Sequence, residues 1–201
     1  VMEDDSLAFK DSISKYIKSE KTFYKVAERL EYLQNKKTGR FKIAKDIGNN
    51  DIVNSLKFNN TPVNVTFNNQ ERVEDLAGRV SKQIYEDSTS LLSAFRDKKF
   101  LEDNNLNEQN VLSIFIPNSY NIYWNSTPED FRDRMLAEYN KFWNKDRSKK
   151  AEKLGLTKLE VISLASIVQI ESRRNDERPR VAGLYINRLK KNMRLQADPT
   201  V

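Results

Sequence analysis

Residues 157–172 read TKLEVISLASIVQIES and carry the clearest structural signal in the chain. Thr157, followed three positions later by Glu160, is typical of a capping box, in which each side chain accepts a hydrogen bond from the backbone at the start of a helix. The residues from Val161 to Val168 are apolar or small on every side, a pattern that predicts a buried helix. We therefore expect this helix to lie in a core and to reach the surface at Glu171.

Glu171 stands where acid–base chemistry would need a carboxyl group. A carboxylate in the last turn of a helix lies at the negative end of the helix dipole, which favours the protonated form, and partial removal from water acts in the same direction. A general acid that protonates a leaving oxygen, as in glycoside cleavage, needs this property. The alternative is a structural glutamate that pairs at the surface with one of three arginines, Arg173, Arg174 or Arg188.

Three polar side chains further along the chain are candidates to meet Glu171: Asn187, Gln196 and Asp198. Asn187 lies near the end of a second helix, expected to begin at about Pro179, whereas Gln196 and Asp198 lie in an extended or turn segment. These residue types also cap helices and form turns readily, so the residues alone leave that alternative open.

The composition limits the chemistry that the chain can perform. Its 201 residues include 0 Cys and 0 His, which excludes disulfides, thiolate nucleophiles, histidine-based triads and Cys or His metal sites. No carboxylate cluster has cation-binding spacing, so we expect no metal and no cofactor.

The net charge of the chain indicates an ordinary solvated surface. The 35 Lys and Arg against 29 Asp and Glu give +6, and charges of the two signs alternate along the chain, which favours a solvated surface over nucleic-acid binding. No apolar stretch is long enough to span a membrane.

The pattern along the chain predicts an α+β protein in two parts. Residues 1–105 combine helical patterns with a strand, Val63 to Phe67, in which apolar and polar residues alternate. Residues 106–201 form a mainly helical part, which includes a helix with Pro128 in its first turn. The charged residues 144–156 are expected to be a linker.

Two stretches resemble a known signature. LASIVQIES at 164–172 and RVAGLYINRLKKNMRLQADPTV at 180–201 are similar to the pattern of the bacterial endolytic murein transglycosylase family (MltG, or YceG-like), roughly ASIVEKET and VAGVFINRLRxGMxLQTDPTV. A weaker match, IPNSY at 116–120, resembles the F-P-D-T-Y element of that family. Departures of the chain from the pattern include Asn118, Ser119, Gln169 and Asn192.

The resemblance implies roles for individual residues. Glu171 matches the catalytic glutamate, and the substrate-binding candidates are Tyr120, Asn187, Gln196 and Asp198. Residues 1–105 would correspond to a small LysM-like α+β module that binds peptidoglycan. Residues 106–201 would form the N-terminal part of a mainly helical catalytic domain that continues beyond this sequence.

The resemblance also implies a reaction and a location. The enzyme would cleave the β-1,4 bond between N-acetylmuramic acid and N-acetylglucosamine within peptidoglycan strands and leave 1,6-anhydro ends. Glu171 would act first as acid and then as base, without a cofactor. The expected partners are peptidoglycan strands and cell-wall synthesis enzymes. An anchor outside this sequence would cross the cytoplasmic membrane once and hold the catalytic region on its outer, periplasmic side.

Two other functions remain open at this level. One is a lysozyme-like hydrolase in which Asp198 is the second carboxylate beside Glu171. The other is a peptidoglycan-binding or scaffold protein without catalytic activity.

Overall fold

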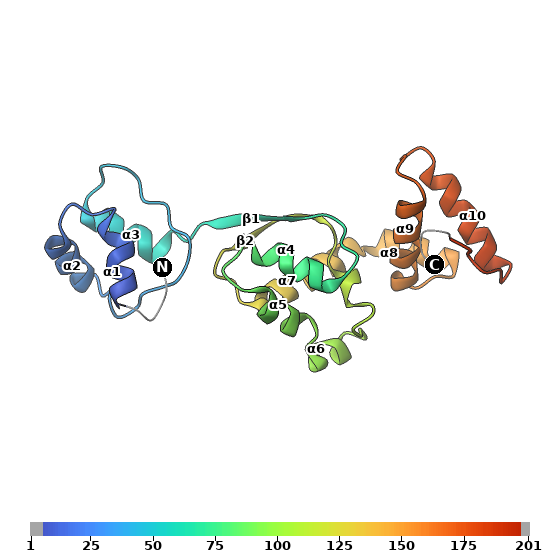
Figure 1. The fold of residues 1–201 in the computed structure, drawn as a ribbon, viewed down its shortest axis with the longest axis horizontal. Helices are drawn as coiled ribbons and strands as arrows, with labels where there is room; N and C mark the ends of the chain where they lie inside the picture. The colour runs from blue at the N-terminus through green and yellow to red at the C-terminus, as the bar shows by residue number, and fades with distance from the viewer. Residues whose placement is uncertain (1–5, 198–201) are drawn as a thin grey trace. The chain divides into compact units, whose positions relative to one another are not determined.

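The computed structural model describes residues 6–197, which divide into two compact units (Figure 1). Unit 1 contains the residues up to Phe95 together with Pro117–Arg132. Unit 2 contains Arg96–Ile116 and the residues from Asp133 onward. The expected boundary after residue 105 falls within unit 2, and the functional assignment of the two parts remains a prediction.

Unit 1 begins with three helices around an aromatic core. They are α1 (Ser6–Ser14), α2 (Glu20–Arg29) and α3 (Asn49–Phe58). The helical spacing of apolar residues in α2 turns Phe23 and Ala27 to the inside. These two pack in one cluster with other buried residues from all three helices and the turn after α2: Phe9, Ile13, Tyr32, Ile52, Val53 and Leu56.

The rest of unit 1 is built on a two-stranded antiparallel sheet. Strand β1 (Pro62–Phe67) pairs with β2 (Asn118–Tyr123), and Val65 lies opposite Tyr120. Alternate residues of β1 are buried, as its period-2 pattern predicts. Unit 1 also contains α4 (Val73–Ser81), α5 (Ser88–Phe95) and the start of α7 (Pro128–Phe142). The α+β class is therefore confirmed, while the LysM-like identity of the first part remains a prediction.

Unit 2 is helical throughout its described part. It contains α6 (Lys98–Asp103), the 3-10 turn η1 (Val111–Ile114), the rest of α7, α8 (Lys145–Leu154), α9 (Lys158–Glu171) and α10 (Arg178–Lys190). None of the helices in residues 6–197 is both long and apolar enough to cross a bilayer.

The prediction of a linker at 144–156 is wrong, because these residues form α8. The Asn144 side chain caps the helix by accepting from the Arg147 N–H at 2.9 Å. Gly155 ends the helix with a left-handed φ of 72°, which a glycine adopts without strain. High charge alone does not prevent a helix when both ends are capped and one residue, here Ala151, is buried.

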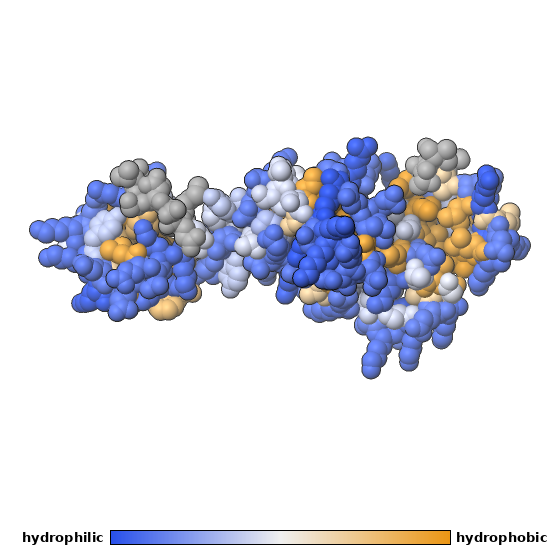
Figure 2. Space-filling model, turned by 90° about the horizontal axis from the view of Figure 1, so that it is seen from below, coloured by the Kyte–Doolittle hydropathy of each residue, from blue (hydrophilic) through white to orange (hydrophobic). Residues whose placement is uncertain are grey.

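The capping box of α9 is confirmed, whereas its burial on all sides is not. Thr157 Oγ1 accepts from the Glu160 N–H at 3.2 Å, and Glu160 Oε2 accepts from the Thr157 N–H at 2.7 Å. Only Leu164 and Val168 of this helix are buried, since the described neighbours of α9 cover one side of it. Ile170 is 54% exposed, and apolar side chains lie open at the C-terminal end of the molecule in Figure 2.

Candidate active site

Glu171 is the last residue of α9, and its carboxyl group contacts a tyrosine of the following helix. The Tyr185 hydroxyl donates a hydrogen bond to Glu171 Oε1 at 2.8 Å. Glu171 is partly buried, so its carboxyl group is held by protein on one side and can reach solvent on another. A carboxyl group of this kind can give or take a proton and still keep one fixed hydrogen-bond partner.

Tyr185 is fixed by packing. It is 4% exposed and belongs to the small apolar cluster of unit 2, together with Leu164, Val168 and Ala197. A buried tyrosine is stable when its hydroxyl finds a partner, and the Glu171 carboxyl supplies one here. The apolar seam between α9 and α10 therefore sets the place of the hydroxyl, and the hydroxyl in turn restricts the carboxyl.

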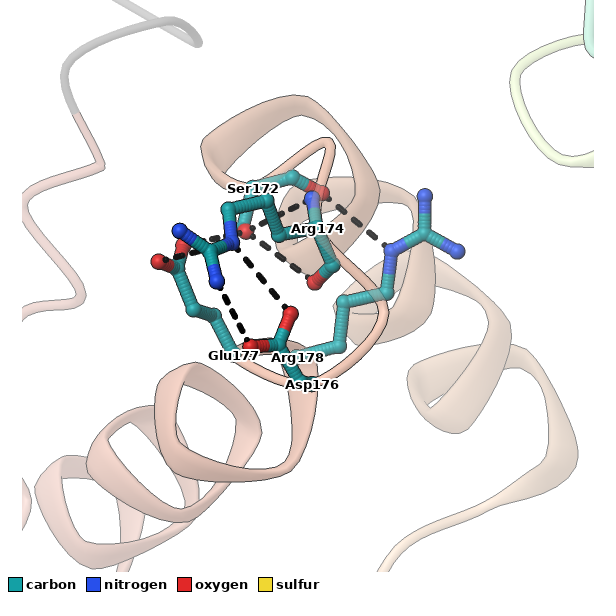
Figure 3. Close-up of polar contacts among 5 residues, drawn as sticks. All are labelled: Ser172, Arg174, Asp176, Glu177 and Arg178. Carbon is teal, nitrogen blue, oxygen red and sulfur yellow. Dashed lines mark hydrogen bonds and ion pairs between the residues drawn. The ribbon is translucent and has the colours of Figure 1, made fainter.

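The turn after Glu171 is held by a polar network that Figure 3 shows in full. Ser172, which is 5% exposed, donates through Oγ to Glu177 Oε2 at 3.0 Å and accepts from the Arg174 N–H at 3.2 Å. Arg178 Nε donates to the carbonyl oxygen of Ser172 at 3.2 Å. These bonds tie the end of α9 to the start of α10, so the backbone next to Glu171 is anchored.

Two of the arginines that could have paired with Glu171 have other partners. Arg174 pairs with Asp176 at 2.9 Å and with Glu177 at 3.4 Å, and its hydrogen bond lowers the pKa of Asp176 below the ordinary value. Arg188 donates to the Leu195 carbonyl oxygen and, at 3.4 Å, to Gln196 Oε1. The contact that the structure gives for the Glu171 side chain is with Tyr185.

The other predicted site residues near the C-terminal end of the chain lie in different surroundings. Gln196 is exposed, has a φ of 51° and is held by Arg188 in the segment that follows α10. Asn187 is exposed on α10 two positions after Tyr185, and this spacing turns it to a different side of the helix. Asp198 lies outside the described residues.

Tyr120 lies in unit 1, where its ring is part of the core. It is 7% exposed and stacks on Phe67 of the partner strand, with ring centroids 5.6 Å apart. This environment explains an aromatic residue at position 120 by packing. A role for Tyr120 in binding substrate remains a prediction.

Tyr185 is a site residue that the sequence analysis did not identify. The available signal was the hydroxyl itself: a tyrosine on the buried side of a helix requires a polar partner.

The described residues contain no group of three or more Asp or Glu that could hold a metal ion. The Glu171 carboxyl group, held by the Tyr185 hydroxyl, can transfer a proton.

Comparison with known proteins places this geometry in a family context. The model of the YceG-like family matches residues 8–201. An endolytic murein transglycosylase of Bacillus subtilis (strain 168) is 35% identical over 74 residues, which are 36% of this chain and 20% of that protein. One of Streptococcus pneumoniae serotype 2 (strain D39 / NCTC 7466) is 33% identical over 86 residues, which are 41% of this chain and 15% of that protein.

A solved structure has a similar fold. It is the 2.6 Å crystal structure of a protein of Listeria monocytogenes described as yceG-like, with a TM-score of 0.52 and 20% sequence identity. The likeness covers 97% of this chain and 68% of that one. At this identity the comparison establishes the shared fold. The present chain thus spans about two thirds of the solved relative and at most a fifth of the two curated ones.

Proposed function

The chain belongs to the YceG-like family, and from that premise we propose that it takes part in peptidoglycan cleavage as an endolytic lytic transglycosylase, with Glu171 as its general acid and base. The observation that carries the proposal is the placement of Glu171. Its carboxyl group is partly buried at the end of α9, hydrogen-bonded to Tyr185, and attached to a backbone turn that the Ser172 network holds. The names of the curated relatives support the choice of substrate class.

The proposed reaction moves one proton out and one proton back. Protonated Glu171 gives its proton to the glycosidic oxygen as the bond from that oxygen to C1 of N-acetylmuramic acid breaks. The glucosamine part leaves with a hydroxyl group. The C6 hydroxyl of the muramic acid then forms a bond to C1 and loses its proton to the Glu171 carboxylate. No water is consumed, so one carboxyl group serves where a hydrolase generally needs two.

Tyr185 acts in this scheme as a positioning residue. Its hydroxyl binds Oε1 and leaves Oε2 for the substrate, which favours one orientation of the carboxyl group. Arg188 lies on α10, three residues after Tyr185. Its side chain donates hydrogen bonds to Leu195 and Gln196 in the segment that follows the helix. Gln196, Asn187, Asp198 and Tyr120 remain proposed contacts for the sugars.

The proposal extends to the whole protein and its surroundings. Its substrate and principal partner would be peptidoglycan strands, met on the outer side of the cytoplasmic membrane, with a membrane anchor supplied outside this sequence. Cell-wall synthesis enzymes are further proposed partners. Residues 1–105 would form the wall-binding part and residues 106–201 the first part of the catalytic domain.

The experiment compares Glu171→Gln with the unchanged protein and with Glu152→Gln. Glu152 is an exposed glutamate of α8 in the same unit, so its variant controls for the loss of one carboxylate. Each variant is made in the full-length protein and incubated with purified peptidoglycan, and the soluble products are measured by mass spectrometry. We expect 1,6-anhydro products from the unchanged protein and from Glu152→Gln, and a loss of at least about a hundredfold for Glu171→Gln. Equal product from Glu171→Gln would refute the role of Glu171, and products heavier by one water would indicate a hydrolase.

A further inference from the structure

A cavity of about 630 Å³ lies in unit 1, whereas Glu171 and Tyr185 belong to unit 2. The segment after α1, the segment before α3 and the first turn of α3 line it. Apolar side chains, including Ile47 and the 3% exposed Ile52, form part of its wall. A volume of this size is in the range of cavities that hold small ligands or short peptide segments.

Three lysines stand around this cavity: Lys15, Lys18 and Lys45. All three are exposed, and none of them makes an ion pair with a residue whose side chain the structure describes, a set that excludes Asp11. Asp46 is the one carboxylate among the described lining residues. The balance of charge at the cavity is therefore positive, and its ammonium groups are available to an anion from outside.

The described part of the same segment has an excess of positive charge. Residues 6–58 contain 12 Lys and Arg and 6 Asp and Glu, and residues 1–5 add the acids Glu3, Asp4 and Asp5, so residues 1–58 carry a net +3. A concentration of like charge around a cavity attracts ligands of the opposite sign and raises their local concentration.

The lining chemistry also indicates what lies beside the anionic group of the ligand. Tyr16 is 64% exposed at the cavity and offers an aromatic face without a packing partner of its own in the described core clusters. Together with the isoleucines it would accommodate small alkyl groups. A phosphate polymer has charge but few such groups, whereas a short alanine-containing peptide has both methyl groups and carboxylates.

We propose that this cavity binds the carboxylate-bearing stem peptide of peptidoglycan. The lysines would neutralise the peptide carboxylates, and the apolar wall would receive its alanine methyl groups. This inference rests on the proposed function for its choice of polymer. It assigns to residues 6–58 the recognition of the peptide part of the substrate, separate from the sugar chemistry at Glu171.

The test measures binding of the synthetic stem pentapeptide N-acetyl-L-Ala-γ-D-Glu-L-Lys-D-Ala-D-Ala, whose acetyl group removes the N-terminal charge, by calorimetry. The unchanged protein is compared with the triple variant Lys15→Gln, Lys18→Gln, Lys45→Gln. The matched control is Lys82→Gln, Lys149→Gln, Lys153→Gln, which removes the same charge from exposed positions outside the cavity. Two further ligands are used: the same pentapeptide with its carboxyl groups amidated, and poly(glycerol phosphate).

We expect the cavity variant to bind the pentapeptide at least about tenfold more weakly, and the control variant to bind within about twofold of the unchanged protein. Amidation should weaken binding to a similar degree, and added salt should reduce the affinity for the acidic peptide more than the affinity for the amidated one. Equal affinity of the two triple variants, or tighter binding of poly(glycerol phosphate) than of the peptide, would overturn the proposal.

The Glu171→Gln variant separates this inference from the proposed function. It should bind the pentapeptide as the unchanged protein does, because the cavity lies in the other unit. Peptide binding without any anhydro product from the unchanged protein would refute the catalytic proposal alone. Anhydro product without peptide binding would refute the cavity proposal alone.

Discussion

The hydroxyl of Tyr185 and Oε1 of Glu171 are 2.8 Å apart, and they bring together the end of α9 and the middle of α10. The tyrosine ring packs against Leu164 and Val168, two residues of the same helix that ends in Glu171. Apolar packing between the two helices thus fixes a hydrogen-bond donor next to the proposed acid. Helix packing and acid–base chemistry are linked through this one side chain.

Replacement of Tyr185 by phenylalanine should slow product formation and leave the fold intact. The ring that packs in the core remains, while the hydrogen bond to Glu171 is lost, and a bond of this kind contributes about 0.5–1.5 kcal/mol. We expect a decrease of about 3- to 10-fold in the rate of anhydro product release at saturating peptidoglycan. The thermal midpoint should change by no more than a few degrees.

A double-mutant cycle tests whether Tyr185 acts through Glu171. In a Glu171→Gln background, Tyr185→Phe should have no further effect on the residual rate, because the group that it positions is already absent. Tyr139→Phe is the matched control, since Tyr139 is also a buried tyrosine in unit 2 and lies in α7. An equal loss of rate from Tyr139→Phe, or additive losses in the cycle, would show that Tyr185 has only a general structural role.

Ser172→Ala should destabilise unit 2 and also reduce activity. The serine hydroxyl is buried and serves both Glu177 and the Arg174 N–H, so alanine leaves these groups without their partner. The expected loss is about 1–2 kcal/mol in the free energy of unfolding, measured by urea denaturation. Ser163→Ala, at an exposed position of α9, should stay within about 0.5 kcal/mol of the unchanged protein. A similar stability for both variants would show that the network does not hold the turn.

Local sequence signals predicted local structure well. Thr157 and Glu160 form the expected capping box, and the alternation from Val63 to Phe67 gives a strand with one buried face. Both features depend only on residues a few positions apart, whose backbone geometry decides the outcome. The charged segment before Gly155 is a helix and not the expected linker, because Asn144 and Gly155 supply caps at its two ends.

Features that depend on contacts between helices were harder to predict from the sequence. The burial of α9 depends on what covers it, and an apolar pattern on every side of a helix does not show which of those sides meets a neighbour. The partnership of Glu171 and Tyr185 likewise depends on how α9 and α10 cross. The sequence marked Glu171 by its place at the helix end, but only the packing of the two helices identified its partner.

Thr157→Ala should weaken α9 and change its response to acid. Loss of the Thr157 side chain removes one half of the capping box and costs about 1 kcal/mol. The hydrogen bond from the Thr157 backbone lowers the pKa of Glu160, so the folded state holds the carboxylate more firmly than the unfolded state does. The stabilisation from Glu160 is therefore present near neutral pH and is lost as the pH falls through this lowered pKa.

Circular dichroism of the two proteins between pH 7 and pH 3 checks this prediction. The unchanged protein should lose helix stability on acidification, and Thr157→Ala should lose less. In the variant Glu160 keeps the hydrogen bond from the backbone N–H of residue 157 but loses the hydrogen bond with the Thr157 side chain, which also lowers its pKa. Parallel acid curves for the two proteins would contradict a coupling between Thr157 and Glu160.

Tyr32→Phe should stabilise the helical part of unit 1. Tyr32 is fully buried beside Phe9, and its hydroxyl has no hydrogen-bond partner within the described part of the chain. A buried hydroxyl that has lost its hydrogen bonds to water and gained none in the protein destabilises the folded state. Its removal should therefore raise the free energy of unfolding by about 1 kcal/mol at neutral pH. Tyr16→Phe, at a largely exposed tyrosine, should have little effect. A destabilised Tyr32→Phe variant would mean that the hydroxyl has a favourable contact after all.

The gain from Tyr32→Phe should grow in alkali. Burial raises the pKa of Tyr32 from 10.0 to about 12, so above pH 10 the unfolded chain releases this proton while the folded chain still holds it. The unchanged protein therefore loses stability between pH 10 and pH 12 at this residue, by about 1 kcal/mol at pH 11. Phenylalanine has no proton to release, so the difference between the two proteins in urea denaturation should be about 1 kcal/mol larger at pH 11 than at pH 9. A constant difference across this range would show that the Tyr32 hydroxyl titrates as an exposed phenol does.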